Sequence, residues 1–193
     1  MVDLRTRTAF AAGHVAGTFS FPLDGSFATY LGWLIPWGTP LTLLGETPRQ
    51  VAAAQRELVR IGIDRPAAAA MGGPADWAGG QPLRSYGQAD FAALAAVRHH
   101  RPVVVLDVRR NLEWAESHLD GAVHIPLQDL LTRLGEVPAG EVWVHCRSGY
   151  RASVAASVLD AAGRTVVAID DEYDHAATAG LPLVSRDGEA QAA

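Results

Sequence analysis

A pattern that occurs twice along the chain limits its fold more than any other feature of the sequence. Residues 2–23, VDLRTRTAFAAGHVAGTFSFPL, align without a gap with residues 106–127, LDVRRNLEWAESHLDGAVHIPL. Both segments carry an Asp-x-Arg motif and an aromatic residue four positions before a histidine. Downstream, residues 40–62 align with residues 140–163 at a similar spacing. An ordered set of matches of this kind indicates two related structural units in one chain.

The second unit alternates between two kinds of segment. Residues 101–109, RPVVVLDVR, and residues 141–146, EVWVHC, are apolar runs typical of strands that are buried on both faces. Helical patterns lie between and after them, and the last of these, at residues 151–163, ends at a glycine. Strands that alternate with helices predict an α/β fold, in which helices flank a parallel sheet on both faces.

The first unit begins abruptly. Its counterpart of the strand at residues 101–109 is reduced to MVDLR, and the strand and helix expected before it are missing. We therefore predict one complete unit and one N-terminally truncated related unit. Two interpretations remain open: a divergent half-domain that packs on the complete unit, or a piece of a longer protein. The predicted domains are residues 1–71, a linker rich in small residues at 72–83, and residues 84–188.

Charge and composition exclude several classes of function. The net charge of −5 gives no basic surface for nucleic acid, and a single cysteine forms no internal disulfide. The most apolar stretch, residues 30–45, is interrupted by Pro36, Gly38 and Pro40 and does not predict a membrane span. We expect a cytoplasmic protein with neither nucleic acid nor a membrane among its partners.

The only cysteine, Cys146, lies where a predicted strand meets a predicted helix. Backbone N–H groups at a helix start lack intrahelical partners, and with the helix dipole they stabilise a thiolate or a bound anion. Arg147 and Arg151 add positive charge, which also favours the thiolate. Gly149 lets the loop turn tightly with its amides inward. The pattern predicts a nucleophilic cysteine at the base of an anion-binding loop.

The remaining loop residues have less specific roles. We expect the backbone amides of Ser148 and Tyr150 to contribute to the anion site, whatever their side chains do. Arg147 is expected to face the substrate. Two roles stay open for Arg151: binding the anion, or tying the loop to the rest of the domain.

The stretch HCRSGYRAS, residues 145–153, resembles the active-site loop of the rhodanese family of sulfurtransferases. The upstream segments VVVLDVR and ESHLDGAVHIPL resemble two accessory signatures of that family, so the likeness covers essentially the whole second unit. It implies a rhodanese-like fold in which Cys146 takes sulfane sulfur from thiosulfate or a persulfide. The sulfur would then pass to cyanide or a thiol, with no metal and no organic cofactor.

Loop length separates this interpretation from a related one. Phosphatases with a similar fold use Cys-x5-Arg, whereas the spacing from Cys146 to Arg151 is Cys-x4-Arg. The shorter loop favours sulfur over phosphate, and a phosphatase or arsenate reductase is the less favoured alternative.

A second alternative concerns the whole chain. By alignment, Gly45 stands at the cysteine position of the first unit and Glu46 at the position of Arg147. The first unit thus resembles the inactive units of tandem rhodaneses. The arrangement resembles the tail of fusion proteins whose front is a metallo-β-lactamase-type persulfide dioxygenase. The chain could therefore act as a docking or sulfur-relay tail for such a domain or partner protein.

Several residues are expected to be structural. Asp107 and Arg109 recur in the unit without a cysteine, which indicates an ion pair that holds the fold. His14 and His118 recur in the same way. His145 could act as a general base, but strand alternation points it away from Cys146. The aromatic residues expected in the core are Phe10, Trp114 and Trp143.

Overall fold

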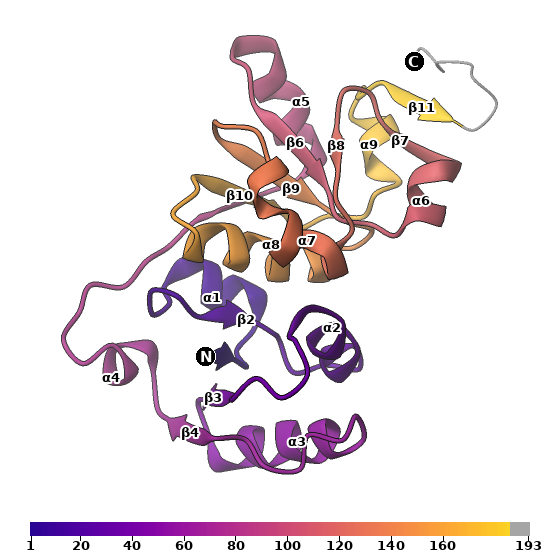
Figure 1. Cartoon of the computed structure of the whole chain (residues 1–193). Helices are drawn as coiled ribbons and strands as arrows, with labels where there is room; N and C mark the ends of the chain where they lie inside the picture. Colours follow the sequence, from indigo (N-terminus) through magenta and orange to yellow (C-terminus); the bar gives the residue numbers. More distant parts are fainter. Residues whose placement is uncertain (186–193) are drawn as a thin grey trace. The chain divides into compact units, whose positions relative to one another are not determined.

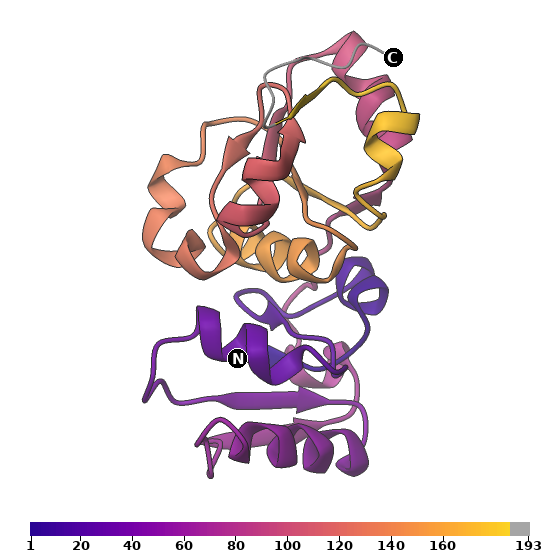
Figure 2. The same cartoon turned by 90° about the vertical axis from the view of Figure 1, so that its right-hand side faces the viewer.

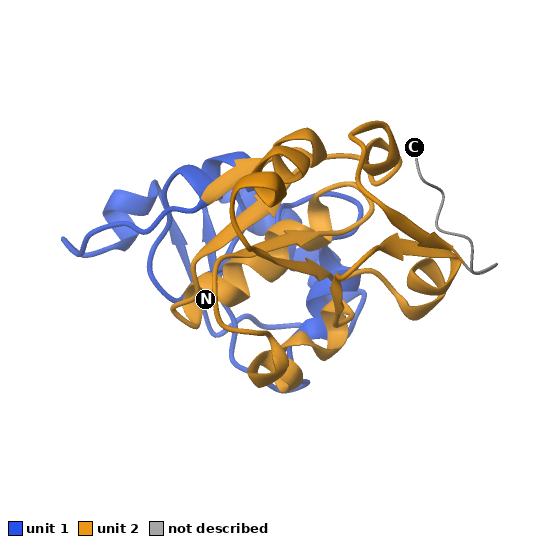
Figure 3. Cartoon of the chain, turned by 90° about the horizontal axis from the view of Figure 1, so that it is seen from above, with its two compact units in different colours: residues 1–86 blue, residues 87–193 orange. Residues whose placement is uncertain are grey.

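The computed structural model of the chain describes residues 1–185 and divides into two compact units, Met1–Tyr86 and Gly87–Ala193 (Figure 3). The predicted domain boundaries stay predictions; within the predicted linker at residues 72–83 the chain forms a short helix, α4 (Pro74–Trp77). The last three residues of the predicted second domain, 186–188, lie outside the described residues. None of the helices in the described part is long and apolar enough to cross a membrane.

The second unit is built on a five-stranded, entirely parallel sheet with the strand order β5-β10-β9-β6-β8 (Figure 1). Its strands are β5 (Gly87–Ala89), β6 (Val104–Asp107), β8 (Val123–His124), β9 (Val142–His145) and β10 (Val166–Ile169). Every residue of the central strand β9 is buried, as its apolar sequence predicts. A small antiparallel pair, β7 (Ser117–Leu119) and β11 (Leu183–Ser185), completes the strands of this unit in the described chain.

Helices cover both faces of this sheet (Figures 1 and 2). They are α5 (Phe91–His100), α6 (Asn111–Glu116), α7 (Leu130–Arg133), α8 (Tyr150–Ala161) and α9 (His175–Thr178), with 3-10 turns η1 (Leu127–Asp129) and η2 (Leu134–Glu136). One face packs under α5 and α9, where Phe91, Leu94 and Ala176 meet Val105, Trp143 and Ile169 of the strands. Helix α8 packs on β9 and β10. The predicted α/β fold is confirmed.

The first unit repeats part of this plan. Its parallel sheet has the order β2-β1-β3-β4, which corresponds to β8-β6-β9-β10 of the second unit. The strands are β1 (Val2–Asp3), β2 (Phe19–Ser20), β3 (Thr42–Gly45) and β4 (Ala68–Met71), and the other helices are α1 (Arg7–Ala12), α2 (Phe27–Leu34) and α3 (Pro48–Val59). Among the described residues of this unit, nothing corresponds to β5 and α5. The described part of the first unit thus repeats four of the five parallel strands of the second.

Strand register fixes the equivalence of the two units. Asp3 pairs with Leu44, and Asp107 pairs with His145. The residues that follow are Gly45 in the first unit and Cys146 in the second, as the sequence alignment predicted. The two units differ on the sheet face that α5 covers in the second unit. At the position of buried Trp143, the first unit has half-exposed Thr42. A smaller, polar side chain suits a face without a covering helix.

Both units hold their first loop with the same buried ion pair. Arg109 donates to Asp107 with an Nη2–Oδ2 distance of 2.6 Å, and Arg5 donates to Asp3 at 2.7 Å. Each arginine also donates to a backbone carbonyl eight residues further on, at Ser117 or Gly13. The predicted structural role of the Asp-x-Arg motif is confirmed.

The repeated histidines are structural as well. The ring of His14 stacks on Phe10 at 4.0 Å, and its Nδ1 lies 2.9 Å from the Phe10 carbonyl oxygen. His118 repeats both contacts with Trp114, at 3.8 Å and 3.0 Å. Phe10 and Trp143 lie in the core as predicted. The prediction for Trp114 was wrong, because its half-buried side chain on helix α6 stacks on the rings of His118 and His124 rather than packing in the core.

The loop of the first unit is filled by its own chain. Gln50 donates from Nε2 to the Leu4 carbonyl oxygen at 2.8 Å and accepts the Glu46 amide through Oε1 at 2.7 Å. A Cβ built at Gly45 would lie 2.9 Å from Val51 Cγ2 and 3.2 Å from Gln50 Oε1. A side chain at the position that carries the cysteine in the second unit would therefore require Val51 and Gln50 to move in the first.

Candidate active site

Cys146 lies between the carboxyl end of β9 and the start of α8, as the sequence predicts. Its side chain is buried, with 2 % of the residue exposed. The backbone N–H of Ala152, in the first turn of α8, donates to Cys146 Sγ at 3.3 Å. A helix amide that points at the sulfur, together with the helix dipole, stabilises negative charge on it.

Gly149 shapes the loop around the sulfur. Its φ of +87° lies in the left-handed region, which a residue with a Cβ enters only at a cost. A Cβ at this position would overlap Asp170 Oδ1 and lie 3.2 Å from Asp170 Cα. Both backbone conformation and space therefore require glycine, and the close approach of Asp170 sets the path of the loop.

Arg151 is held by α6. Its Nη1 and Nη2 donate to the two carboxylate oxygens of Glu113 at 2.6 and 2.8 Å, and both side chains are largely buried. These bonds show that Arg151 ties the loop to the rest of the domain, which is one of the two roles that the sequence left open. The predicted contact between Arg151 and a bound anion stays a prediction, since both terminal nitrogens face this carboxylate.

Glu113 is the centre of this arrangement. Burial by itself would raise its pKa, but the hydrogen bonds from Arg151 and from the Arg110 backbone and the charge of Arg151 lower the pKa of Glu113 from 4.5 to about 2. Glu113 also closes the N-terminus of α6 by accepting the Arg110 amide at 3.0 Å. One carboxylate thus joins α6 to the start of α8.

Glu113→Gln is expected to lower the free energy of unfolding by about 1–3 kcal/mol at neutral pH, because Arg151 loses its charged partner in a buried setting. Because the pKa of Glu113 is lower in the folded than in the unfolded protein, its carboxylate stabilises the fold at pH values above the unfolded pKa, and this stability is lost as the pH falls toward about 2. The difference in the free energy of unfolding between wild type and variant should therefore narrow as the pH drops below 4.5. Urea unfolding at several pH values measures it, with exposed Glu116→Gln on the same helix as the control. A pH-independent difference would contradict the assignment.

The other loop residues are placed differently. Arg147 and Ser148 are exposed, whereas Tyr150 is buried. Arg147 Nη2 lies 3.8 Å from Asp174 Oδ2, and the Arg147 carbonyl oxygen accepts the Tyr173 amide at 2.8 Å. The assigned substrate contacts of these residues stay predictions.

A polar group lies under the loop, on the sheet face of α5. His145 is fully buried, and its Nε2 is 3.7 Å from Asp107 Oδ2. Its ring is near-parallel to that of Tyr173 at 5.8 Å, and the Arg109 guanidinium lies 3.6 Å from the Tyr173 ring centroid. Burial lowers the pKa of His145 despite the nearby carboxylate of Asp107, so the ring is neutral at neutral pH. This packing agrees with the prediction that His145 points away from Cys146.

Glu113, Tyr173 and Asp174 were not among the residues predicted from the sequence. Glu113 had a local signal, because an acidic residue three positions after Arg110 is typical of a helix start. Tyr173 and Asp174 follow β10 and reach the loop only because β10 lies beside β9 in the sheet. No local pattern predicts that contact.

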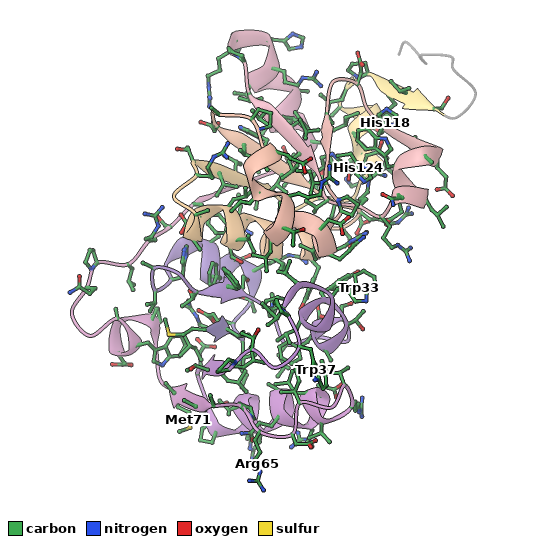
Figure 4. All side chains as sticks on the ribbon, in the orientation of Figure 1. Trp33, Trp37, Arg65, Met71, His118 and His124 are labelled. Carbon is green, nitrogen blue, oxygen red and sulfur yellow. The ribbon has the colours of Figure 1, made fainter. Side chains whose placement is uncertain are left out.

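A cavity of about 780 Å³ lies in the first unit. It opens between α2 and the segment after α3, and Trp33, Trp37 and Arg65 lie along it (Figure 4). Its lining residues run from Ala28 to Ala67, so Cys146 takes no part in it.

The family comparison decides what kind of domain carries the loop. A model of the rhodanese-like domain matches residues 91–175, a range that contains Cys146 and the whole loop. Residues 91–175 form a rhodanese-like domain.

Relatives of known name share this region. The chain is 34% identical over 95 residues to the HTH-type transcriptional regulator Rv0324 of Mycobacterium tuberculosis, covering 48% of this chain and 42% of the relative. It is 37% identical over 60 residues to YrkF of Bacillus subtilis, named for a sulfur-carrier role, covering 31% and 32%. The chain thus spans less than half the length of either curated relative.

Two solved structures illustrate the likeness. The reduced CoADR-RHD protein of Bacillus anthracis is 26% identical with a TM-score of 0.45, over 49% of this chain and 17% of that one. A thiosulfate sulfurtransferase of Pseudomonas aeruginosa is 22% identical with a TM-score of 0.45, over 94% and 36%. The family match supports sulfur transfer as the general chemistry of this rhodanese-like domain.

Proposed function

We propose that the second unit is a sulfurtransferase in which Cys146 carries the sulfur. The observation that carries this proposal is the Ala152 amide at the start of α8, which donates to the buried Cys146 Sγ. A sulfur atom at that place is stabilised as an anion, and an anionic sulfur is the form that attacks a sulfane sulfur.

The transfer has two balanced steps. The Cys146 thiolate attacks the outer sulfur of thiosulfate, or the sulfane sulfur of a low-molecular-weight persulfide. A new S–S bond forms at Cys146 while sulfite or a thiolate leaves. A thiophilic acceptor, cyanide or a thiolate, then attacks the outer sulfur of the Cys146 persulfide, and Cys146 leaves as thiolate. No net oxidant, metal or organic cofactor is required.

The loop residues have separate roles in this scheme. The backbone amides of residues 147–151 surround the persulfide, and the positive φ of Gly149 sets the turn of the loop that directs them inward. Arg147 is the exposed cation of the loop and receives the charged part of the donor. Glu113 holds Arg151, and through it the first turn of α8, in place.

A second candidate function is a docking or sulfur-relay tail for a persulfide dioxygenase-type domain or partner protein. It is favoured by the first unit, which keeps the same scaffold but has Gly45 in place of the cysteine. In that case Cys146 would exchange sulfur rapidly only with that partner.

The proposal is tested by intact mass. The reduced protein is incubated with thiosulfate and, separately, with glutathione persulfide. A gain of one sulfur atom that cyanide removes is expected, and Cys146→Ser should show none. Since the chain has a single cysteine, any persulfide is located without peptide mapping. No gain with either donor would contradict the enzyme and favour the relay function. Hydrolysis of an aryl phosphate that depends on Cys146 would favour a phosphatase.

A further inference from the structure

An acidic segment borders the loop of Cys146. It runs from Asp170 to His175, directly after β10, and it contains four carboxylates, those of Asp170, Asp171, Glu172 and Asp174. Tyr173 attaches it to the loop, since its amide donates to the Arg147 carbonyl oxygen at 2.8 Å. At its other end, Asp170 is packed against Gly149. The segment therefore follows the loop along its length.

The positive charges of the loop are matched by carboxylates. Arg151 is paired with Glu113 in a buried position, and Arg147 faces Asp174 across 3.8 Å. The second pair is open to water, with 57% of the Arg147 side chain and 78% of the Asp174 side chain exposed. Such a pair holds the two side chains together only weakly, but both charges stay beside the site.

The members of the acidic segment differ in what they do. Asp171 accepts the Phe91 amide at 3.2 Å and lies 2.6 Å from His175 Nδ1, which raises the pKa of His175. Asp170 fixes the loop at Gly149. Glu172 and Asp174 are exposed, and we therefore treat these two as the charges that an approaching molecule meets.

We propose that Glu172 and Asp174 set the charge preference of the Cys146 site, so that its sulfur acceptor is a small thiol with a positively charged group. This inference rests on the proposed function. Exposed carboxylates beside a binding site raise the local concentration of cations and lower that of anions. An acceptor with its own carboxylate meets repulsion at the same place.

The chemical step is the second half of the transfer. The acceptor thiolate attacks the outer sulfur of the Cys146 persulfide, the S–S bond to Cys146 Sγ breaks, and the acceptor leaves as a persulfide. The cationic group takes no part in this exchange. It changes how often a productive encounter occurs, which is a property of the field around the loop.

The test uses the full chain and three thiols of similar size. The Cys146 persulfide is formed with inorganic polysulfide and verified by intact mass. Its decay is then followed with cysteamine, 2-mercaptoethanol and 3-mercaptopropionate at low salt, above the titration range of His175. Each rate is divided by the rate of the same thiol with a small-molecule persulfide. Cysteamine should exceed 3-mercaptopropionate roughly tenfold, and added salt should reduce the ratio.

Two matched variants locate the effect. In Glu172→Gln/Asp174→Asn the ratio should fall to roughly two or three, because two of the four carboxylates are neutral. The control variant Glu136→Gln/Glu141→Gln also removes two negative charges. Glu141 precedes β9 and Cys146 follows it, so the two residues are separated by roughly 16 Å along the strand. The control ratio should equal that of wild type.

Two outcomes overturn the inference separately. The charge preference alone would be overturned if the persulfide forms but its normalised decay rate does not depend on the charge of the thiol. It would also be overturned if the ratio of the cysteamine rate to the 3-mercaptopropionate rate is the same in wild type and both variants. Failure of Cys146 to form a persulfide would overturn the proposed function, and the inference with it.

Discussion

Gly149→Ala is expected to lower the rate of sulfur loading on Cys146 on the order of 100-fold, because the loop amides are displaced from the sulfur. The added methyl group would overlap Asp170 Oδ1 and lie 3.2 Å from its backbone, so a side-chain rotation does not relieve it. The φ of +87° adds strain of its own. Stopped loading reactions analysed by intact mass give the rate, and far-ultraviolet circular dichroism shows that the domain is folded.

The chain offers a matched control for this change. Gly163, just past the end of α8, also has a positive φ, of +76°, but a Cβ there would have no neighbour within 4 Å. Gly163→Ala should cost about 1 kcal/mol of stability from backbone strain and leave sulfur loading intact. Equal loading in both variants would mean that the course of the loop at Gly149 is not needed for the chemistry.

Asp107→Asn is expected to lower the free energy of unfolding by about 3–5 kcal/mol, because it leaves Arg109 buried without its charged partner. Asp107 is fully buried and accepts from the Arg109 backbone amide at 2.9 Å as well as from the guanidinium. Burial opposes the charged form, but the hydrogen bonds and the charge of Arg109 lower the pKa of Asp107, so the carboxylate is charged at neutral pH.

Urea unfolding measures this loss, and the exposed pair of Arg133 and Glu136 provides the comparison. Its Nη2–Oε2 distance of 2.7 Å is within 0.1 Å of that of the buried pair, yet Glu136→Gln should cost less than about 1 kcal/mol because both groups stay hydrated. A cost for Asp107→Asn that is no larger than this would show that the Asp-x-Arg motif does not hold the loop.

The sequence was sufficient for the fold class and for the relation between the two units, because the units are repeats. Once Asp3 is aligned with Asp107, Gly45 is placed at the cysteine position. Cys146 and Gly149 were predicted as site residues because a strand, a loop and a helix start follow one another directly in the chain. Elements that follow one another directly in the chain can be predicted from the sequence without knowledge of the tertiary structure.

What surrounds the loop could not be predicted in the same way. Glu113 and Arg151 are 38 residues apart in the chain and meet only when α6 and α8 are folded. Asp174 reaches Arg147 through the adjacency of β9 and β10. The error for Trp114 has a related cause: an aromatic residue on a short surface helix found two histidine rings to stack on, which periodicity does not reveal.

The side chain of Gln50 occupies the loop of the first unit that corresponds to the Cys146 loop of the second. It bonds the backbone at Leu4 and at Glu46. A side chain added at Gly45 would meet Val51 and Gln50, and displacing Gln50 would remove both hydrogen bonds. A cysteine placed at Gly45 alone therefore does not rebuild, in the first unit, the loop that surrounds Cys146 in the second.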